Sequence, residues 1–265
     1  MEKTAQLLEW NNTPPKTFAR VNSLKADASK LIEQWREENV DYAFVRRDWL
    51  DENVVFELKS HPPLAKLPSF QQGLFYIQDP STLLAVRELN PQPGETILDL
   101  CAAPGGKTTY IAQLMQNRGK LIAHDLAPER LKLIEENCAR LGVTRAEIVS
   151  TLDPRPSTLD RILVDAPCSN TGVMRRRVDL RWRIRPEEIE RLHATQMDLL
   201  NCAAALLKSG GTLVYSTCSL EPEENQKVVE EFLRERSDFK LASERELLPF
   251  TNEVDGAFVA RLIKQ

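Results

Sequence analysis

From Gly73 to its end, the chain alternates between short apolar segments typical of strands and longer segments typical of helices. This alternation predicts an α/β fold with a mostly parallel sheet and helices on both of its faces. The expected strands are residues 96–101, 121–125, 148–151, 162–165, 212–216 and 258–263, the last of them at an edge of the sheet. The expected helices begin near Asp79, Lys107, Pro128, Pro186 and Pro222; the third ends at Gly142 and the fourth at the Ser-Gly-Gly of residues 209–211.

The first 72 residues have a less regular pattern. Residues 17–21 and 54–58 have the character of strands, and three prolines within residues 61–68 interrupt regular structure. We therefore expect a small α/β subdomain over residues 1–72 and a larger domain over residues 73–265.

The overall charge and the cysteine pattern exclude several classes of protein. The 265 residues carry a formal net charge of -4, with a pI of about 5.6, which excludes a protein that coats nucleic acid through general positive charge. No apolar segment is long enough for a signal peptide or a transmembrane helix, so we expect a cytoplasmic protein without a membrane partner. The five cysteines contain no C-x-x-C pair, which argues against a disulfide framework and against a metal site.

A glycine-rich turn follows the first expected strand of the larger domain, in Asp99-Leu-Cys-Ala-Ala-Pro-Gly-Gly-Lys-Thr-Thr109. Small residues at the start of a helix let backbone N–H groups approach a nucleotide-like ligand. Gly106-Lys107-Thr108 matches the end of a P-loop, and residues 162–165 could serve as the magnesium-binding strand of an NTPase. Cys101 occupies the position of the first P-loop glycine, which counts against an NTPase; the strand at residues 162–165 keeps an NTPase as the alternative interpretation.

Two further sets of residues follow other strands, at the edge where ligands bind in such sheets. Asp125 ends the second strand, about 20 positions after the glycines, where an acidic residue commonly accepts hydrogen bonds from ribose hydroxyls. Cys168 and Cys218 each follow a strand, in Asp165-Ala-Pro-Cys168 and Ser216-Thr-Cys218-Ser219. Two cysteines at neighbouring strand ends are harder to explain as structural residues than one, and they indicate a catalytic role.

These motifs, in this order, resemble the RNA (cytosine-5) methyltransferases of the Nop/Sun group, and most closely the bacterial RsmB-type enzymes of 16S ribosomal RNA. The resemblance rests on the glycine-rich turn, on Asp-Ala-Pro-Cys-Ser-x-Thr-Gly from residue 165, on Thr-Cys-Ser followed by Pro-Glu-Glu-Asn from residue 217, and on residues 20–25, 76–80 and 256–261. It implies a Rossmann-like class I methyltransferase sheet, S-adenosylmethionine as the cofactor and RNA, with ribosomal RNA expected, as the substrate.

No obligate protein partner is expected. The RsmB-type enzymes usually carry an additional N-terminal helical RNA-binding domain, which we expect to be missing here. A non-catalytic RNA-binding module is the third interpretation, and the presence of both Cys168 and Cys218 argues against it.

The resemblance also implies roles for individual residues. Cys218 would be the nucleophile that adds to cytosine, Cys168 would help to release the product, and Asp165 would lie between the cofactor and the target base. From the strand-end positions alone, we expect Lys107 to lower the pKa of Cys218. The residues expected to hold S-adenosylmethionine are Cys101, Ala102, Ala103, Pro104, Gly105, Gly106, Lys107, Asp125, Arg130, Asp153 and Asp165.

A basic segment after Cys168 is the expected RNA-facing surface, and we also expect an RNA-binding role for residues 1–72. The segment contains Met174-Arg-Arg-Arg177 and Arg181-Trp-Arg-Ile-Arg185, whose arginines suit phosphates and whose tryptophan suits base stacking. The alternative is a solvated face whose arginines pair with neighbouring glutamates. The residues expected to contact RNA are Arg175, Arg176, Arg177, Arg181 and Trp182. The related enzymes usually have Asn-Pro or His-Pro before the aspartate at 179, whereas this chain has Arg177-Val178, which leaves the loop path and the target choice open.

Overall fold

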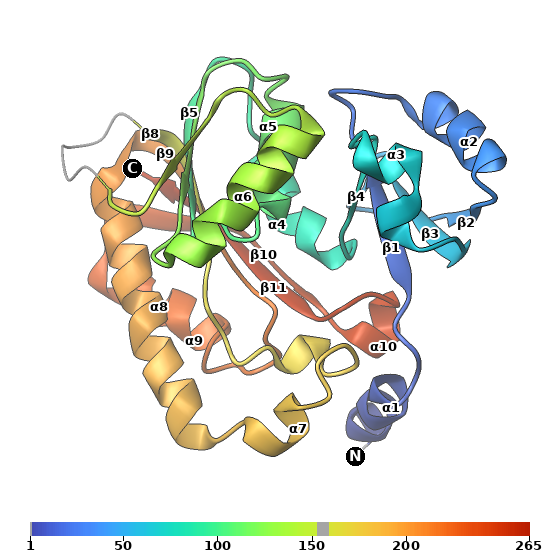
Figure 1. Cartoon of the computed structure of the whole chain (residues 1–265). Helices are drawn as coiled ribbons and strands as arrows, with labels where there is room; N and C mark the ends of the chain where they lie inside the picture. Colours follow the sequence, from blue (N-terminus) through green and yellow to red (C-terminus); the bar gives the residue numbers. More distant parts are fainter. Residues whose placement is uncertain (1, 153–158) are drawn as a thin grey trace. The chain divides into compact units, whose positions relative to one another are not determined.

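The computed structural model of the chain describes residues 2–152 and 159–265 (Figure 1). Its strands are β1 (Thr17–Val21), β2 (Asp41–Phe44), β3 (Val55–Ser60), β4 (Phe75–Ile77), β5 (Thr96–Leu100), β6 (Lys120–His124), β7 (Ala146–Val149), β8 (Leu159–Asp165), β9 (Leu207–Thr217), β10 (Phe239–Leu247) and β11 (Ala257–Lys264). They form a four-stranded sheet in the order β2-β3-β1-β4 and a seven-stranded sheet in the order β10-β11-β9-β8-β5-β6-β7. The predicted α/β fold class is confirmed.

The helices connect these strands, and the chain divides into two compact units. The α-helices are α1 (Glu2–Asn11), α2 (Ala28–Glu37), α3 (Pro68–Gln71), α4 (Ser81–Leu89), α5 (Gly106–Leu114), α6 (Pro128–Leu141), α7 (Leu180–Arg183), α8 (Pro186–Leu206), α9 (Gln226–Glu235) and α10 (Pro249–Asn252), with short 3-10 helices at Leu64–Lys66 and Thr171–Val173. Unit 1 comprises Met1–Pro15, Thr96–Cys101 and Asp153–Gln265, and unit 2 comprises Lys16–Glu95 and Ala102–Leu152. The predicted division of the chain at residue 72 stays a prediction.

Unit 1 holds three neighbouring parallel strands, β5, β8 and β9. Their centres are apolar and fully buried, as Ile162, Leu163 and Val164 of β8 illustrate, which is typical of parallel strands covered on both faces. The long helix α8 packs along β8 and β9. Because parallel strands end at the same edge, the segments that follow Leu100, Asp165 and Thr217 all begin at one edge of this unit.

The strand at the end of the chain is not the predicted edge strand. β11 lies between β10 and β9 and pairs with both in the antiparallel direction. The edge is formed by β10, a strand that the sequence did not predict, because only its end residues Phe239 and Leu247 are buried and the residues between them are mostly charged or polar. Charged residues on an edge strand oppose pairing with other chains, so this pattern fits its place in the sheet.

Some boundaries also differ from prediction. α8 ends at Leu206, and the Ser-Gly-Gly expected to end it lies inside β9, where the register with β8 shifts between Leu159 and Arg161. The last long helix begins at Gln226 rather than at Pro222, because Pro222 to Asn225 form a turn.

Unit 2 contains the four-stranded sheet and the parallel pair β6 and β7. In the core of the smaller sheet, Trp35 of α2 contacts Phe56 and Phe75 edge-on, with ring centroids 5.4 Å apart in both pairs. α6 begins at Pro128 and ends before Gly142, which adopts a left-handed φ of 77°, as predicted. Within the described residues, no helix is long and apolar enough to cross a membrane.

Candidate active site

The structure brings the two strand-end cysteines of unit 1 into contact. Cys168 follows β8 and Cys218 follows β9, and their Sγ atoms are 3.4 Å apart. Both residues are half-buried, and neither is in a disulfide. At the end of β8, Asp165 accepts a hydrogen bond from Ser216 Oγ at 2.8 Å, so this carboxylate is held beside the end of β9.

Asn170 connects the two cysteine loops, a role that the sequence analysis missed. Its Nδ2 donates to the carbonyl oxygen of Cys168 at 2.6 Å, and its Oδ1 accepts from Cys218 Sγ at 3.0 Å. Gly172 allows the loops to approach, because a Cβ atom there would lie 2.7 Å from the carbonyl oxygen of Cys218 and 2.8 Å from Gly256 Cα. Both residues belong to the Cys-Ser-Asn-Thr-Gly run after residue 167, which was the signal available in the sequence.

The surroundings of the two thiols are unequal. The hydrogen bond with Cys218, followed by burial and by the nearby charges of Cys218 and Glu224, raises the pKa of Cys168 well above its ordinary value. Loss of the proton from Cys168 is therefore disfavoured in the free protein. This asymmetry fits a pair in which one thiol attacks and the other acts later.

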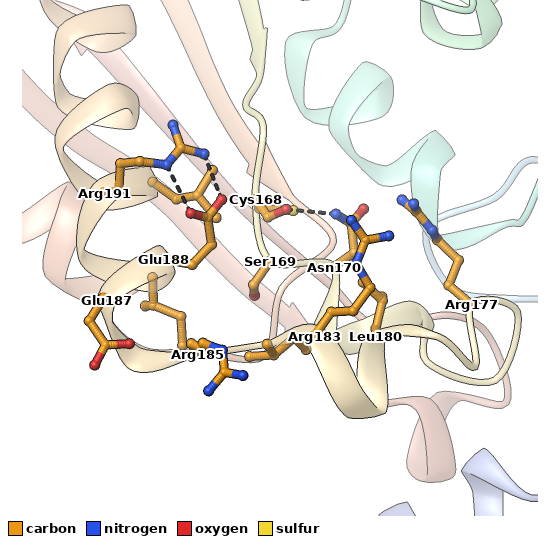
Figure 2. Close-up of a pocket in the computed structure, with 13 residues that line it drawn as sticks. Cys168, Ser169, Asn170, Arg177, Leu180, Arg183, Arg185, Glu187, Glu188 and Arg191 are labelled. Carbon is orange, nitrogen blue, oxygen red and sulfur yellow. Dashed lines mark hydrogen bonds and ion pairs between the residues drawn. The ribbon is translucent and has the colours of Figure 1, made fainter.

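A cavity of about 670 Å³ opens in unit 1 with Cys168 in its wall (Figure 2). It is lined by Cys168, Ser169, Asn170, Arg177, Leu180, Arg183, Ile184, Arg185, Glu187, Glu188, Ile189, Arg191 and Leu192. Arg183 pairs with Asp179 at 3.2 Å and Arg191 with Glu188 at 2.6 Å. By contrast, the guanidinium groups of Arg177 and Arg185 have no ion pair or hydrogen bond to any described residue, so they are available to an anionic ligand.

In the basic segment, some arginines are bound by other residues of unit 1 and others are available to a ligand. Arg175 is 5% exposed; it lies over the Trp10 ring at 4.2 Å, with Asp255 Oδ1 3.5 Å away, and Arg176 donates to the same carboxylate. These two arginines therefore hold their own loop in place, which argues against their expected contact with RNA. The sequence could not separate them from Arg177, because adjacent arginines look alike until their partners are known.

The remaining residues expected to contact RNA lie in α7. Arg181 donates to Asn12 Oδ1 at 3.0 Å and to the carbonyl oxygen of Asn11, so it fastens α7 to the end of α1. Trp182 is 83% exposed, which leaves its indole ring available for stacking.

In unit 2, the turn that begins at Ala102 is built around Asp125. The carboxylate is buried; it accepts from the N–H of Ala103 at 3.2 Å and lies 3.3 Å from Arg130. Arg130 also donates to the carbonyl oxygen of Ala103 at 3.1 Å. Gly105 supplies the sharp entry to α5 with a φ of 100°, and there a side chain would also crowd Ile134. Three of the residues expected to bind the cofactor are thus joined to one another.

Arg20 supports this turn from within unit 2, and the sequence analysis assigned it no role. It is fully buried and donates to the amide oxygen of Gln78, to the carbonyl oxygen of Gly106 at 2.8 Å and to Thr109 Oγ1 at 2.9 Å. Burial lowers the pKa of Arg20 to about 10, so it remains a cation at neutral pH. The sequence signal was its place in residues 20–25, one of the segments in the family resemblance.

The other expected site residues are distributed between the units. Cys101, with a φ of 65°, and Asp165 belong to unit 1, whereas Lys107 is the second residue of α5 in unit 2. The expected effect of Lys107 on Cys218 stays a prediction. Asp153 lies outside the described residues.

Comparisons with known proteins identify close similarities. The model of the family "16S rRNA methyltransferase RsmB/F" matches residues 86–263. The probable ribosomal RNA small subunit methyltransferase B of Bacillus subtilis is 42% identical over 234 residues, which cover 86% of this chain and 51% of the relative. Ribosomal RNA small subunit methyltransferase B of Photorhabdus laumondii is 37% identical, over 98% of this chain and 62% of the relative. The chain therefore spans between about half and two thirds of the length of these relatives.

Solved structures extend the similarity to the fold. A methyltransferase homolog protein from Pyrococcus horikoshii has a TM-score of 0.86 and 32% identity, and the match covers 100% of this chain and 91% of that chain. NSun6 from Pyrococcus horikoshii, whose structure was determined with SFG, has a TM-score of 0.87 and 25% identity, with 99% and 94% covered. These likenesses confirm the predicted Rossmann-like sheet.

Proposed function

This chain belongs to the RsmB/F family of 16S rRNA methyltransferases, and we propose that it transfers a methyl group from S-adenosylmethionine to carbon 5 of a cytosine in ribosomal RNA. The observation that carries the proposal is the contact between Cys168 and Cys218, with 3.4 Å between the sulfur atoms. Methyl transfer to a ring nitrogen or a hydroxyl needs no thiol, because those atoms offer their own lone pairs. Carbon 5 of cytosine becomes nucleophilic only after a thiolate has added to carbon 6.

In the proposed reaction, the Cys218 thiolate forms a bond with carbon 6 while ring nitrogen 3 gains a proton or a hydrogen bond. Asp165 is the proposed donor to that nitrogen, and its bond from Ser216 orients it. S-adenosylmethionine, when bound, supplies an electrophilic methyl group, which carbon 5 takes. A base then removes the proton from carbon 5, ring nitrogen 3 returns any proton it gained to Asp165, and the bond between sulfur and carbon 6 breaks, which restores the aromatic ring and the Cys218 thiolate.

Cys168 is the proposed base of the release step. In the free protein, its pKa is raised first by the hydrogen bond with Cys218 and also by the charge of Cys218. Both effects disappear once Cys218 is bonded to carbon, because a thioether sulfur carries no charge. Cys168 can then lose its proton to solvent and accept the proton of carbon 5. The order of events therefore follows from the contact between the two sulfurs.

The family resemblance assigns the cofactor to residues 101–107, Asp125, Arg130, Asp153 and Asp165, and the structure describes residues 102–107, Asp125 and Arg130 of this set in unit 2. The residues fit the group: the buried Asp125 carboxylate suits ribose hydroxyls, and the start of α5 suits the carboxylate of the methionine part. Gly106 lets the Tyr76 ring pack against the start of α5, because a Cβ atom there would lie 3.0 Å from that ring. SFG, an analogue of S-adenosylmethionine, in the NSun6 structure gives further support.

The proposed RNA surface comprises Arg177 and Arg185, which line the cavity with Cys168 in its wall, and the exposed Trp182 of α7. Unpaired guanidinium groups suit phosphates, and an exposed indole suits an unstacked base. We also propose that residues 1–72 add RNA contacts to a catalytic domain formed by residues 73–265. A ribosomal RNA substrate would place the reaction in the cytoplasm.

The proposal is tested by product analysis. The protein is incubated with S-adenosylmethionine carrying a labelled methyl group and with small-subunit ribosomal RNA that lacks base methylation. Nucleosides from the digested RNA are then separated by chromatography and identified by mass spectrometry. Label in 5-methylcytidine is the expected result, and label only in a nitrogen- or oxygen-methylated nucleoside would contradict the proposal.

A further inference from the structure

Behind the two cysteines lies a carboxylate that the proposed reaction does not use. Glu224 follows β9 in the turn before α9, and its residue is 0% exposed. No lysine, arginine or histidine among residues 2–152 and 159–265 forms an ion pair with it. A buried carboxylate without a cationic partner is costly unless hydrogen bonds compensate for the lost water.

The compensating hydrogen bonds come from both cysteine loops. Oε1 of Glu224 accepts from the N–H of Ser169 at 2.8 Å, and Oε2 accepts from the hydroxyl groups of Ser169 and, at 2.5 Å, Ser219. Ser169 directly follows Cys168, and Ser219 directly follows Cys218. One carboxylate thus holds the residue next to each reactive sulfur, and the two serine hydroxyls are also 3.1 Å apart.

Two further contacts fix Glu224, one at its carboxylate and one at its backbone. Gln196 of α8 donates to Oε1 at 3.2 Å and to the carbonyl oxygen of Pro167 at 2.9 Å, so the helix contacts both Glu224 and the Cys168 loop. The backbone carbonyl of Glu224 accepts from the Tyr215 hydroxyl at 2.6 Å. Glu224 is therefore held at its backbone from β9 and at its carboxylate from α8, and the carboxylate cannot move without disturbing its contacts with the two cysteine loops.

The negative charge of Glu224 also acts on the cysteine pair. It is one of the causes, after the hydrogen bond with Cys218, burial and the Cys218 charge, that raise the pKa of Cys168. It likewise contributes, after burial and Cys168, to the raised pKa of Tyr215. A neutral amide could make similar hydrogen bonds, so a purely structural clamp would not need a charge at this place.

We propose that Glu224 is a positioning residue that holds the two cysteine loops together and whose buried negative charge disfavours the thiolate form of Cys168. This proposal rests on the proposed function, which gives Cys168 and Cys218 their catalytic roles. Glu224 touches neither RNA nor cofactor in this role; it acts through Ser169 and Ser219.

The first test compares the reactivity of the two thiols in the absence of RNA and cofactor, so its result is independent of the methylation chemistry. The full chain and Glu224→Gln are treated with iodoacetamide, and the alkylation rates of Cys168 and Cys218 are followed separately by peptide mass spectrometry. The amide keeps the shape of the side chain but removes its charge. Cys168 should react at least about threefold faster in the variant, because removal of the nearby negative charge increases the fraction of Cys168 present as thiolate.

The matched control is Glu223→Gln. Glu223 is the preceding residue, 44% exposed and paired with Lys227 at 2.7 Å, so its variant removes the same charge without touching either cysteine loop. Its alkylation rates should equal those of the unmodified chain. Equal Cys168 rates in Glu224→Gln, Glu223→Gln and the unmodified chain would overturn the proposal.

The second test covers the clamp, and it remains informative if Glu224→Ala does not fold. Ser169→Ala removes one hydroxyl contact but keeps the backbone contact to Glu224. Ser169→Ala should lower the rate at which Cys218 forms an adduct with RNA and leave the affinity for S-adenosylmethionine unchanged. As single variants, Glu224→Gln should retain more of the adduct-forming rate of the unmodified chain than Glu224→Ala does. Unaltered adduct formation in Ser169→Ala and in a folded Glu224→Ala would overturn the clamp.

Discussion

Arg20 donates from Nη1 to the carbonyl oxygen of Gly106 at 2.8 Å, so a residue of β1 holds the first residue of α5. The same guanidinium donates to Thr109 one turn later and lies over the rings of Tyr76 and Tyr110. The N-terminal sheet and the expected cofactor turn are thus joined inside unit 2 by one buried cation. This gives the N-terminal segment a part in shaping the turn.

We expect Arg20→Met to lower the free energy of unfolding by about 2–4 kcal/mol. Bonds from a charged donor contribute about 1.5–3 kcal/mol each, and relief from burying the charge offsets part of their loss. Urea unfolding measures the difference. Arg191→Met is the control, because its pair with Glu188 is exposed, and it should leave stability unchanged. Equal stability of both variants would show that the buried contacts contribute nothing.

The stability difference between the unmodified chain and Arg20→Met should be constant from pH 6 to pH 9. Burial lowers the pKa of Arg20 to about 10 from an ordinary value of 12.5, so the folded state disfavours the cation. Below pH 10 both the folded and the unfolded state hold the proton, and the cost is fully present. The cost of burying the Arg20 cation is relieved only as the pH rises above 10, where the folded state loses this proton before the unfolded state does. There the unmodified chain should gain stability relative to the variant. A gain already between pH 6 and pH 9 would contradict a guanidinium that stays protonated there.

Asp125→Asn should weaken S-adenosylmethionine binding by about 10- to 100-fold. This range corresponds to the loss of one charge-assisted hydrogen bond, about 1.5–3 kcal/mol. Isothermal titration calorimetry measures the affinity, and Glu129→Gln, an exposed carboxylate in the first turn of α6, serves as the control. An unchanged affinity in Asp125→Asn would show that the ribose binds elsewhere.

Arg177→Ala and Arg185→Ala should each weaken RNA binding and flatten its salt dependence, because each removes an available guanidinium group beside the cavity. Arg183→Ala and Arg191→Ala are matched controls from the same lining, and their guanidinium groups already pair with Asp179 and Glu188. Filter binding at several salt concentrations gives the slopes. An equal loss of RNA affinity in all four variants would show that the ion pairs of Arg183 and Arg191 do not decide which arginines bind RNA.

Gly172→Ala should slow methylation more than it affects cofactor binding. The added methyl group would lie 2.7 Å from the carbonyl oxygen of Cys218 and would push the cysteine loops apart, at a cost of about 1–3 kcal/mol. Gly94→Ala is the control, because no atom lies within 4 Å of its added carbon and only its backbone with a φ of 95° is strained. A normal rate in Gly172→Ala would mean that the spacing of the loops is not critical.

The parts of the site that follow directly from strand ends could be predicted from sequence. Cys168, Cys218 and Asp125 each come directly after a recognisable apolar strand, and parallel strands end at one edge. Arg20 and Glu224 could not be assigned in this way. Their partners lie up to 89 and 55 positions away in sequence, and nothing local indicates a buried charge.

The differences between expectation and structure have a similar cause. Arg175 was expected to face RNA, but its loop turns it toward Trp10 and Asp255, which lie far away in sequence. β10 was missed because its exposed charged residues hide the alternation of a strand, and β11 was consequently placed at the edge. Local pattern indicates which segments are regular, whereas the partner of each polar side chain depends on the tertiary fold.

The central claim is that Cys218 attacks the base and Cys168 releases it, and one measurement tests it most directly. Each single cysteine-to-alanine variant is incubated with RNA and S-adenosylmethionine and then analysed by denaturing electrophoresis for a covalent protein–RNA adduct. Cys168→Ala should accumulate the adduct, because attack and methyl transfer proceed while release is blocked. Cys218→Ala and the double variant should show neither adduct nor product. An adduct in Cys218→Ala but not in Cys168→Ala would reverse the two roles, and unimpaired turnover in both single variants would contradict the covalent mechanism itself.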